Sequence, residues 1–184
     1  MAGIPENHDN LPLLSEEKTK TLLLVRHAKS SWDISDLNDF ERPLNDRGKK
    51  DAPVMAKRLL HKKVHIDAFV SSPAKRAKKT AELFCREYKR KEDEIIFISK
   101  LYHASPEVFF EVIAELDNSF DTVAIFSHNM GITEFVNLLV KDTKIDNMPT
   151  CAVFAVQTNI KKWSDFKNEK RQFLFFDYPK NEEN

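Results

Sequence analysis

The sequence contains very little glycine. Only three of its 184 residues are glycine, at positions 3, 48 and 131. Neither a GxGxxG nor a GxxxxGK[ST] pattern occurs, so the glycine-rich loops that cradle nucleotide phosphates are excluded. Any affinity of this chain for anions must therefore come from a local cluster of arginine and lysine side chains.

Cysteine, net charge and long apolar runs are also scarce. Cys85 and Cys151 form no CxxC pair and have no metal-ligand spacing, so we expect two reduced, buried thiols. The 29 basic and 29 acidic residues cancel, which predicts no long-range field that attracts nucleic acid. No apolar run approaches the length of a bilayer span, and the first residues do not resemble a signal peptide. We therefore expect a cytoplasmic protein with no nucleic-acid or membrane partner.

The overall composition is that of a globular protein. Hydrophobic residues make up 41% of the chain and charged residues 32%, and the length fits one domain. Residues 1–19 are polar, include two prolines and have little periodicity, which predicts a flexible N-terminal tail. We expect residues 20–180 to form a single domain.

Short apolar runs alternate with stretches of helical periodicity along this domain. The predicted strands are residues 21–25, 67–70, 95–98, 122–126, 151–156 and 173–176. The predicted helices are residues 46–61, 74–90, 106–116 and 131–140. This alternation predicts an α/β fold of three layers, in which helices flank a mostly parallel central sheet.

Side chains that can bind or react with a ligand follow several of the predicted strands. Arg26 and His27 end the first run, Arg76 lies one turn into the helix after the second, and His103 and His128 follow the third and fourth. Ligands of such a sheet bind beyond the carboxyl ends of its strands. Arginine matches phosphate oxygens with a fork of donors, and a neutral imidazole can act as a nucleophile. We therefore predict a site for a tetrahedral anion at this edge.

Three segments also resemble a known family. Residues 22–32, LLLVRHAKSSW, resemble the Arg-His-Gly motif of the histidine phosphatase superfamily, with Ala28 in place of the glycine. Residues 71–82 are similar to its second arginine motif, and residues 127–131 to its second histidine motif. RHAKSSW, together with ERPLNDRG at residues 41–48, most resembles the small SixA-like phosphohistidine phosphatases. The resemblance covers roughly residues 20–158.

The resemblance implies a phosphoglycerate mutase-like fold and a phosphatase mechanism. His27 attacks phosphorus and forms a phosphohistidine intermediate, which water then hydrolyses. Arg26, Arg76 and His128 bind the phosphoryl oxygens and stabilise their charge. No cofactor and no metal are required. The implied substrate is phosphohistidine in a protein.

Two positions depart from the family pattern. Asp33 stands where relatives carry asparagine, and a carboxylate there would repel phosphate unless it is protonated or turned away. His103 stands where relatives often carry a glutamate that donates a proton, so either His103 is the donor or the donor is missing. Because an imidazole leaving group has a far lower pKa than an alcohol, a missing acid favours a phosphohistidine substrate. Arg42 and Arg47 are expected to have structural roles.

Three alternatives remain open at this point. The first is a phosphomonoesterase that acts on a small phosphorylated metabolite. The second is a non-catalytic family member that binds a phosphorylated ligand, for which Ala28 and Asp33 are the support. The third is a metal-dependent hydrolase built on His27, His103 and His128, which is the weakest because too few carboxylates follow the strands.

Overall fold

The structure, a computed structural model, describes residues 19–31, 37–141 and 144–181. The predicted tail of residues 1–19 lies outside these ranges except for Thr19, which begins the first strand. Asp33 also lies outside the described residues. Within the described ranges, no helix is long and apolar enough to cross a membrane. The cytoplasmic location stays a prediction.

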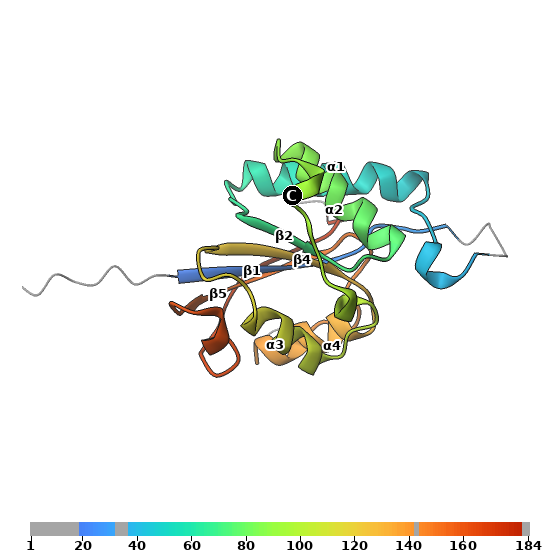
Figure 1. Ribbon diagram of the computed structural model, residues 1–184. Coiled ribbons are helices and arrows are strands. Elements are labelled where there is room, and N and C mark those ends of the chain that lie inside the picture. The colour runs from blue at the N-terminus through green and yellow to red at the C-terminus, as the bar shows by residue number, and fades with distance from the viewer. Residues whose placement is uncertain (1–18, 32–36, 142–143, 182–184) are drawn as a thin grey trace, which may run out of the picture.

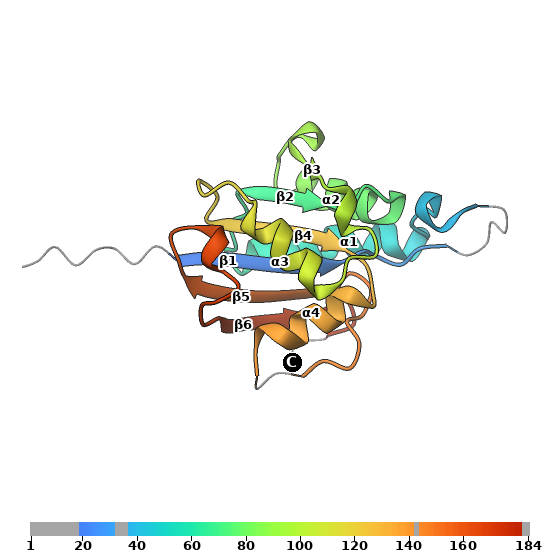
Figure 2. The same cartoon turned by 60° about the horizontal axis from the view of Figure 1, so that its bottom comes forward.

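A six-stranded sheet forms the centre of the molecule, in the order β3-β2-β4-β1-β5-β6 (Figure 2). Its strands are β1 (Thr19–Arg26), β2 (Ala68–Ser71), β3 (Ile96–Phe97), β4 (Thr122–Ser127), β5 (Val153–Asn159) and β6 (Gln172–Asp177). The first four in chain order are parallel, and β5 runs antiparallel to both β1 and β6. The predicted mostly parallel α/β sheet is confirmed.

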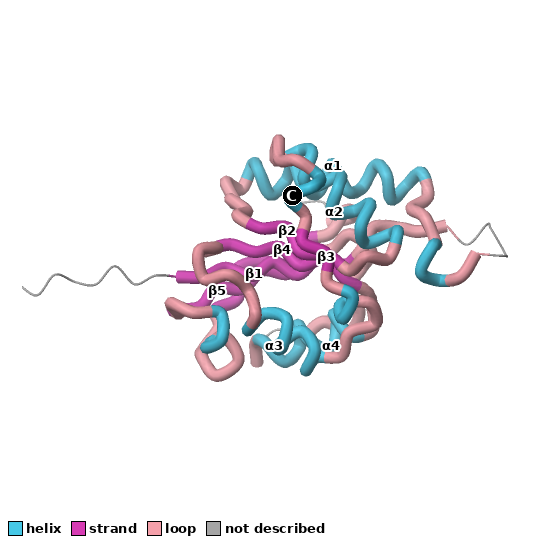
Figure 3. The backbone as a smooth tube through the Cα atoms, viewed as in Figure 1, coloured by secondary structure: helices cyan, strands magenta, loops and turns pink. Residues whose placement is uncertain are grey.

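Helices cover both faces of the sheet, which completes the three predicted layers (Figures 1 and 3). One face carries α1 (Asp46–His61) and α2 (Lys75–Glu87); the other carries α3 (Pro106–Ala114) and α4 (Gly131–Leu139). The short 3-10 helices are η1 (Asp39–Glu41), η2 (Glu92–Glu94), η3 (Ser99–Leu101) and η4 (Trp163–Asp165). The four predicted helices are confirmed, although α2 ends three residues earlier than expected.

The apolar run of β1 explains why the sheet is buried on both faces. Leu22 and Leu24 pack into the core under α3 and α4, while Leu23 and Val25 pack into the core under α1 and α2. All four are fully buried. A strand that is apolar without alternation is typical of a parallel sheet covered on both sides.

Two glycines allow helices to pack directly against the loops that follow the strands. A Cβ atom at Gly48 in α1 would overlap the backbone of Lys29, and one at Gly131 in α4 would overlap the backbone of Ala104. Only glycine permits such close backbone approach. The loops after β1 and before α3, which contain His27 and His103, are therefore held against the starts of two helices.

The register of the sheet brings the three family motifs to one edge. Arg26 at the end of β1 is paired with Ser127 at the end of β4, and Ser71 at the end of β2 is paired with Phe126. His27 and His128 therefore leave neighbouring strands at the same level. Arg76, the second residue of α2, follows Ser72 by four residues and lies above the same edge.

Candidate active site

The backbone around His27 is fixed from two sides. Its N–H donates to the carbonyl of Ser127 at 3.0 Å, and its carbonyl accepts from the N–H of Cys151 at 3.1 Å. The next residue, Ala28, donates its N–H to Oγ1 of Thr80 in α2 at 3.0 Å. The side chain of His27 therefore projects from a rigid segment rather than from a loose loop.

The ring of His27 is held in one tautomer. Its Nδ1 lies 2.8 Å from the carbonyl oxygen of Ala28, which can only accept, so Nδ1 carries the proton. The lone pair is therefore on Nε2, where Nε of Arg76 donates to it at 3.2 Å. Burial, with the nearby positive charges of Arg76 and Arg26 acting in the same direction, lowers the pKa of His27 to about 3. The ring is neutral near pH 7, and its free nitrogen can attack an electrophile.

Arg76 is buried in the first turn of α2, and Asp39 binds the outer side of its guanidinium. Its Nη2 forms an ion pair with Oδ2 of Asp39 at 2.8 Å, and its Nη1 donates to the Asp39 backbone carbonyl. Together with the contact to His27, these bonds fix the plane of the guanidinium. The remaining N–H groups of Arg76 are available for an oxyanion, because guanidinium has five donors.

His128 lies beside His27, with ring centroids 5.2 Å apart. Its Nε2 is 2.8 Å from Oγ of Ser72, while its buried Nδ1 has no hydrogen-bond partner among the described residues. Burial, with the neighbouring His27 and Arg76 acting in the same direction, lowers its pKa to about 2. A buried polar atom left without a partner is costly unless a ligand or water satisfies it.

Arg26 is the fourth predicted residue at this edge. Its Nη1 donates to the carbonyl of Met148 at 2.5 Å, whereas its buried Nε has no partner in the described part of the chain. Burial and the charge of Arg76 lower its pKa, so two like charges are held close together. Such a pair favours an anion that can neutralise both.

These side chains share one cavity of about 200 Å³. The cavity is lined by Arg26, His27, Lys29, Ser30, Asp39, Arg42, Arg76, His103, His128, Asn129 and Thr150. The structure thus brings all four predicted phosphate-site residues together, and it adds Lys29 and Arg42. Arg42, expected to be structural, also lies 3.4 Å from Asp39. Within the ranges that the structure describes, no group of three His, Cys, Asp or Glu side chains could hold a metal ion.

His103, the candidate proton donor, lies at the rim of this cavity. Its side chain is 57% exposed, and its Nε2 is 3.4 Å from Oδ2 of Asp39. The backbone of His103 adopts a positive φ of 53°, an uncommon conformation for a non-glycine residue. The packing of Gly131 against the adjacent Ala104 keeps this turn in place.

Asp39 is the site residue that sequence reasoning missed. It belongs to η1, between the first predicted strand and the first predicted helix, and nothing in its spacing indicates that it reaches Arg76. Burial acts to raise its pKa, but hydrogen bonds from Tyr102 and Arg76 outweigh this and lower the pKa to about 2. The Tyr102 hydroxyl lies 2.8 Å from Oδ2. Asp39 is therefore an ionised carboxylate at the rim of a cationic cavity.

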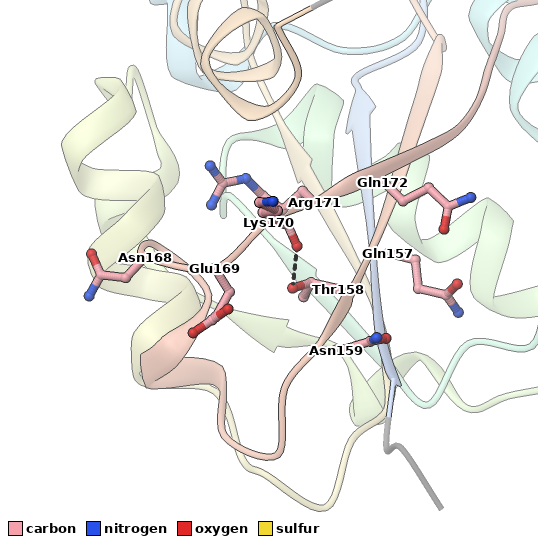
Figure 4. A pocket seen from close by; sticks show the side chains of 8 residues that line it. All are labelled: Gln157, Thr158, Asn159, Asn168, Glu169, Lys170, Arg171 and Gln172. Atoms are coloured by element: carbon pink, nitrogen blue, oxygen red, sulfur yellow. Dashed lines mark hydrogen bonds between the residues drawn. The ribbon is translucent and has the colours of Figure 1, made fainter.

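A larger cavity, of about 540 Å³, lies at the opposite edge of the sheet (Figure 4). It is lined by residues 157–159 and 168–172, and Asn159 pairs there with Thr19, the first residue of β1. The Thr158 hydroxyl donates to the carbonyl of Lys170 at 2.8 Å. Figure 4 shows Asn168 and Gln172 extending to different sides, so the lining side chains do not converge on one point.

The model of the histidine phosphatase superfamily (branch 1) matches residues 22–99, which include Arg26, His27 and Arg76. This segment of the chain therefore resembles the histidine phosphatase superfamily. The resemblance predicted from the sequence is confirmed over these residues. His128 lies outside the matched residues, and its place in the site comes from the register of β1 and β4.

A curated protein and several solved structures are also similar to this chain. A chloroplastic, uncharacterised protein of Arabidopsis thaliana is 28% identical over 129 residues, which cover 66% of this chain and 59% of that protein. The chain thus spans less than two thirds of that relative. The protein histidine phosphatase SixA complexed with tungstate has a similar fold, with a TM-score of 0.74, 21% identity, and coverage of 88% of this chain and 98% of that one.

A second solved structure with this fold carries a name from another substrate class. The mycobacterial glucosyl-3-phosphoglycerate phosphatase has a TM-score of 0.60 and 15% identity, and the match covers 84% of this chain and 97% of that one. At such identities the likeness concerns the fold, which serves both a protein phosphatase and a small-metabolite phosphatase. The fold alone therefore does not select the substrate.

Proposed function

We propose that this protein is a phosphatase in which His27 accepts a phosphoryl group from phosphohistidine in a protein. The observation that carries the proposal is the state of the His27 ring. The Ala28 carbonyl holds the proton on Nδ1, so Nε2 carries the lone pair, which accepts from Nε of Arg76 at 3.2 Å until a phosphoryl group takes its place. A nucleophilic nitrogen beside an anion-binding guanidinium is the arrangement that phosphoryl transfer to histidine needs.

The cationic neighbours bind the phosphoryl oxygens in this proposal. Arg76 donates from its remaining N–H groups, and Arg26 offers the buried Nε that lacks a partner among the described residues. The Ser72 hydroxyl accepts from the Ala74 N–H at 3.3 Å, so its own hydrogen can be donated to Nε2 of His128. We therefore assign the His128 proton to the unpartnered Nδ1, which then donates to an oxygen.

The reaction proceeds in two balanced steps. The lone pair of His27 Nε2 attacks phosphorus in line with the bond to the leaving group, and the electron pair of that bond departs with the leaving nitrogen. Water then attacks phosphorus, the bond to Nε2 breaks, and its electron pair returns to the ring. Both water protons stay with the phosphate, which is released as dihydrogen phosphate. The protein contributes positioning and charge stabilisation throughout, as is usual for phosphoryl transfer.

The rim of the cavity supports a protein substrate. The floor residues His27, Arg76 and His128 are buried, whereas the side chains of Asp39 and His103 at the rim are 38% and 57% exposed. A phosphorylated side chain on a protein surface could thus present its phosphoryl group to the floor while its carrier stays outside. The expected partner is a phosphorylated protein.

A small phosphorylated metabolite is the second candidate substrate. The observation in its favour is His103, an exposed imidazole at the rim that could protonate an alkoxide leaving group. Alcohols have a high pKa and leave slowly without such a donor. In this case the enzyme is a phosphomonoesterase that uses the same His27 intermediate.

Trapping of the phosphoenzyme tests the proposal. The protein is mixed with a 32P-labelled phosphohistidine protein, quenched in alkali, and digested to locate the label. Label on His27 that is stable to alkali and lost in acid is expected, with release of phosphate that EDTA does not change and vanadate blocks. His27→Asn should carry no label, and His61→Asn, an exposed histidine on α1, is the matched control.

The same assay separates the alternatives. Faster turnover of sugar phosphates than of phosphohistidine protein would favour the phosphomonoesterase, and that activity should then fall in His103→Asn. Tight binding of the phosphorylated protein without label or phosphate release would indicate a non-catalytic binding protein. Unchanged turnover in His27→Asn would contradict every version of the mechanism.

A further inference from the structure

Asp39 places one negative charge at the rim of an otherwise cationic cavity. Among the described residues that line the cavity it is the one carboxylate, beside Arg26, Lys29, Arg42 and Arg76. A carboxylate near a phosphate site weakens binding of the dianion through like-charge repulsion. Its presence there therefore calls for a function that offsets this cost.

The position of Asp39 relative to the nucleophile is defined by Arg76. The guanidinium contacts His27 Nε2 through Nε and the Asp39 carboxylate through Nη2, at 3.2 and 2.8 Å. Asp39 thus lies one guanidinium further from the nucleophile, toward the exposed rim. In an in-line transfer the leaving group departs on the side away from His27, which is the side of the rim.

Asp39 cannot supply a proton in this arrangement. The groups that face it are Arg76, Arg42, Tyr102 and His103, of which two are guanidinium cations and one is a hydroxyl donor. These contacts keep the carboxyl ionised at neutral pH. An ionised carboxylate can accept a hydrogen bond from a leaving group and can stabilise its positive charge, but it cannot protonate an alkoxide.

The surroundings of Asp39 already accommodate an imidazole ring. Nε2 of His103 approaches Oδ2 at 3.4 Å, and the rings of His103 and Tyr102 lie with centroids 4.1 Å apart. Phe40 packs edge-on against Tyr102 at 5.1 Å and extends this aromatic wall. A flat, N–H-bearing ring that enters from solvent could make the same contacts with the carboxylate and with the aromatic wall.

We propose that Asp39 determines specificity by selecting a substrate whose leaving group is a protonated imidazole over one whose leaving group is an alcohol. The inference rests on the proposed function and names the feature of the substrate that the site recognises, which is the protonation state of its leaving group. The substrate is phosphohistidine protonated on the ring nitrogen that does not carry phosphorus, and that N–H donates to Asp39.

The transfer balances without an acid from the protein. His27 Nε2 forms a bond to phosphorus, and the bond from phosphorus to the substrate nitrogen breaks with its electron pair left on that nitrogen. The substrate ring departs as neutral imidazole and keeps its distant N–H. The positive charge passes to the phosphorylated His27 ring, whose Nδ1–H donates to the Ala28 carbonyl. Asp39 and Ala28 thus accept from the two exchanging rings in the same way.

Paired substrates test this inference. The catalytic efficiency kcat/KM is measured for a phosphohistidine peptide and for p-nitrophenyl phosphate, with unmodified protein, Asp39→Asn and Glu41→Gln. Glu41 belongs to the same short helix but does not line the cavity, so its variant removes the same charge from a neighbouring position. Asp39→Asn should lower efficiency on the peptide by about tenfold and leave or raise that on the ester, while Glu41→Gln changes neither.

A pH profile separates charge selection from structural support. Because a carboxylate stabilises the protonated substrate ring, its removal should move the alkaline limb of phosphohistidine turnover to lower pH. Equal losses on both substrates with an unmoved limb would mean that Asp39 only supports Arg76, and the inference would be wrong while the proposed function stands. Failure of the unmodified protein to turn over either substrate would contradict the proposed function, and the inference with it.

Discussion

The two ends of strand β1 both bury cationic side chains, but they satisfy them differently. At the start, the ammonium of Lys20 donates to the carbonyls of Asn118 and Phe120 at 3.0 and 2.8 Å and pairs with Asp121 at 3.0 Å. These contacts use all three of its donors. At the other end, buried nitrogens of Arg26 and His128 have no partner among the described residues.

The difference separates a structural site from a chemical one. A complete set of hydrogen bonds around a buried charge fixes the local structure and leaves nothing for a ligand. An incomplete set costs stability, which natural proteins accept mainly where function requires it. The unpartnered nitrogens therefore support the proposal that the reaction takes place at the carboxyl end of β1.

Cavity size alone would place a ligand at the start of β1 instead. The larger cavity, of about 540 Å³, lies at the Lys20 end, and the cavity around His27 has about 200 Å³. In the proposed function the ligand is a phosphoryl group, which is small and is bound by charge rather than by apolar enclosure, so the larger cavity need not be its site. Perturbed histidines are the better guide.

Arg76→Lys tests the role of the cationic site at the carboxyl end of β1. Lysine replaces the planar fork of five donors by a compact ammonium with three, so it cannot reproduce the spacing of the contacts to His27, Asp39 and a phosphoryl oxygen. We expect kcat/KM to fall by about 10²–10³ with little change in the free energy of unfolding. The exposed neighbour Lys75→Ala should be unaffected in steady-state assays. A loss below threefold would mean that Arg76 does not contact the transferred group.

Lys20→Met tests the opposite end. The variant removes the Lys20 donor from the carbonyls of Asn118 and Phe120, although Phe120 keeps the Trp163 indole N–H, and it leaves Asp121 without its ion pair. We expect a loss of about 2–3 kcal/mol in the free energy of unfolding. Urea unfolding measures the loss, and Lys161→Met at an exposed position is the control. Activity per folded molecule should stay constant. A lowered kcat in fully folded Lys20→Met protein would contradict a purely structural role for the start of β1.

Acid should destabilise the protein through its two buried histidines. Their pKa values are lowered from 6.5 to about 3 for His27 and about 2 for His128. As pH falls below about 6.5 the unfolded chain takes up protons that the folded protein does not, so stability present above that pH is lost progressively. The free energy of unfolding should fall by up to about 1.4 kcal/mol per pH unit for each histidine.

Variants sharpen this pH prediction. Urea unfolding between pH 6.5 and 5 should give a shallower dependence for His27→Asn and for His128→Asn, and the shallowest for the double variant. Slopes identical to that of the unmodified protein would show that the folded state protonates these rings as readily as the unfolded chain does.

Much of the site could be predicted because each part has a local signal. The run of apolar residues before Arg26 and His27 predicts a strand end, and the motifs around Arg76 and His128 place them after neighbouring strands. The parallel sheet then requires that they meet. The predicted fold followed from the same alternation of strands and helices.

The contacts between loops and helices could not be predicted in this way. Asp39 reaches Arg76 from an irregular segment, where no periodicity reports which residue points inward. The tautomer of His27 depends on the direction of the Ala28 carbonyl, which the residue types do not reveal. Both depend on backbone geometry that only the folded chain defines.

Gln172→Ala carries the smallest expected effect and tests the comparison of the two cavities. Gln172 lines the larger cavity from β6 (Figure 4) and is not part of the lining of the cavity around His27. If charge rather than volume locates the reaction, kcat/KM should change by no more than about twofold, as for other surface substitutions. Phosphatase assays measure this beside Arg76→Lys. A tenfold loss in Gln172→Ala would mean that the larger cavity takes part in binding the substrate, and the reaction could no longer be assigned from unpartnered nitrogens alone.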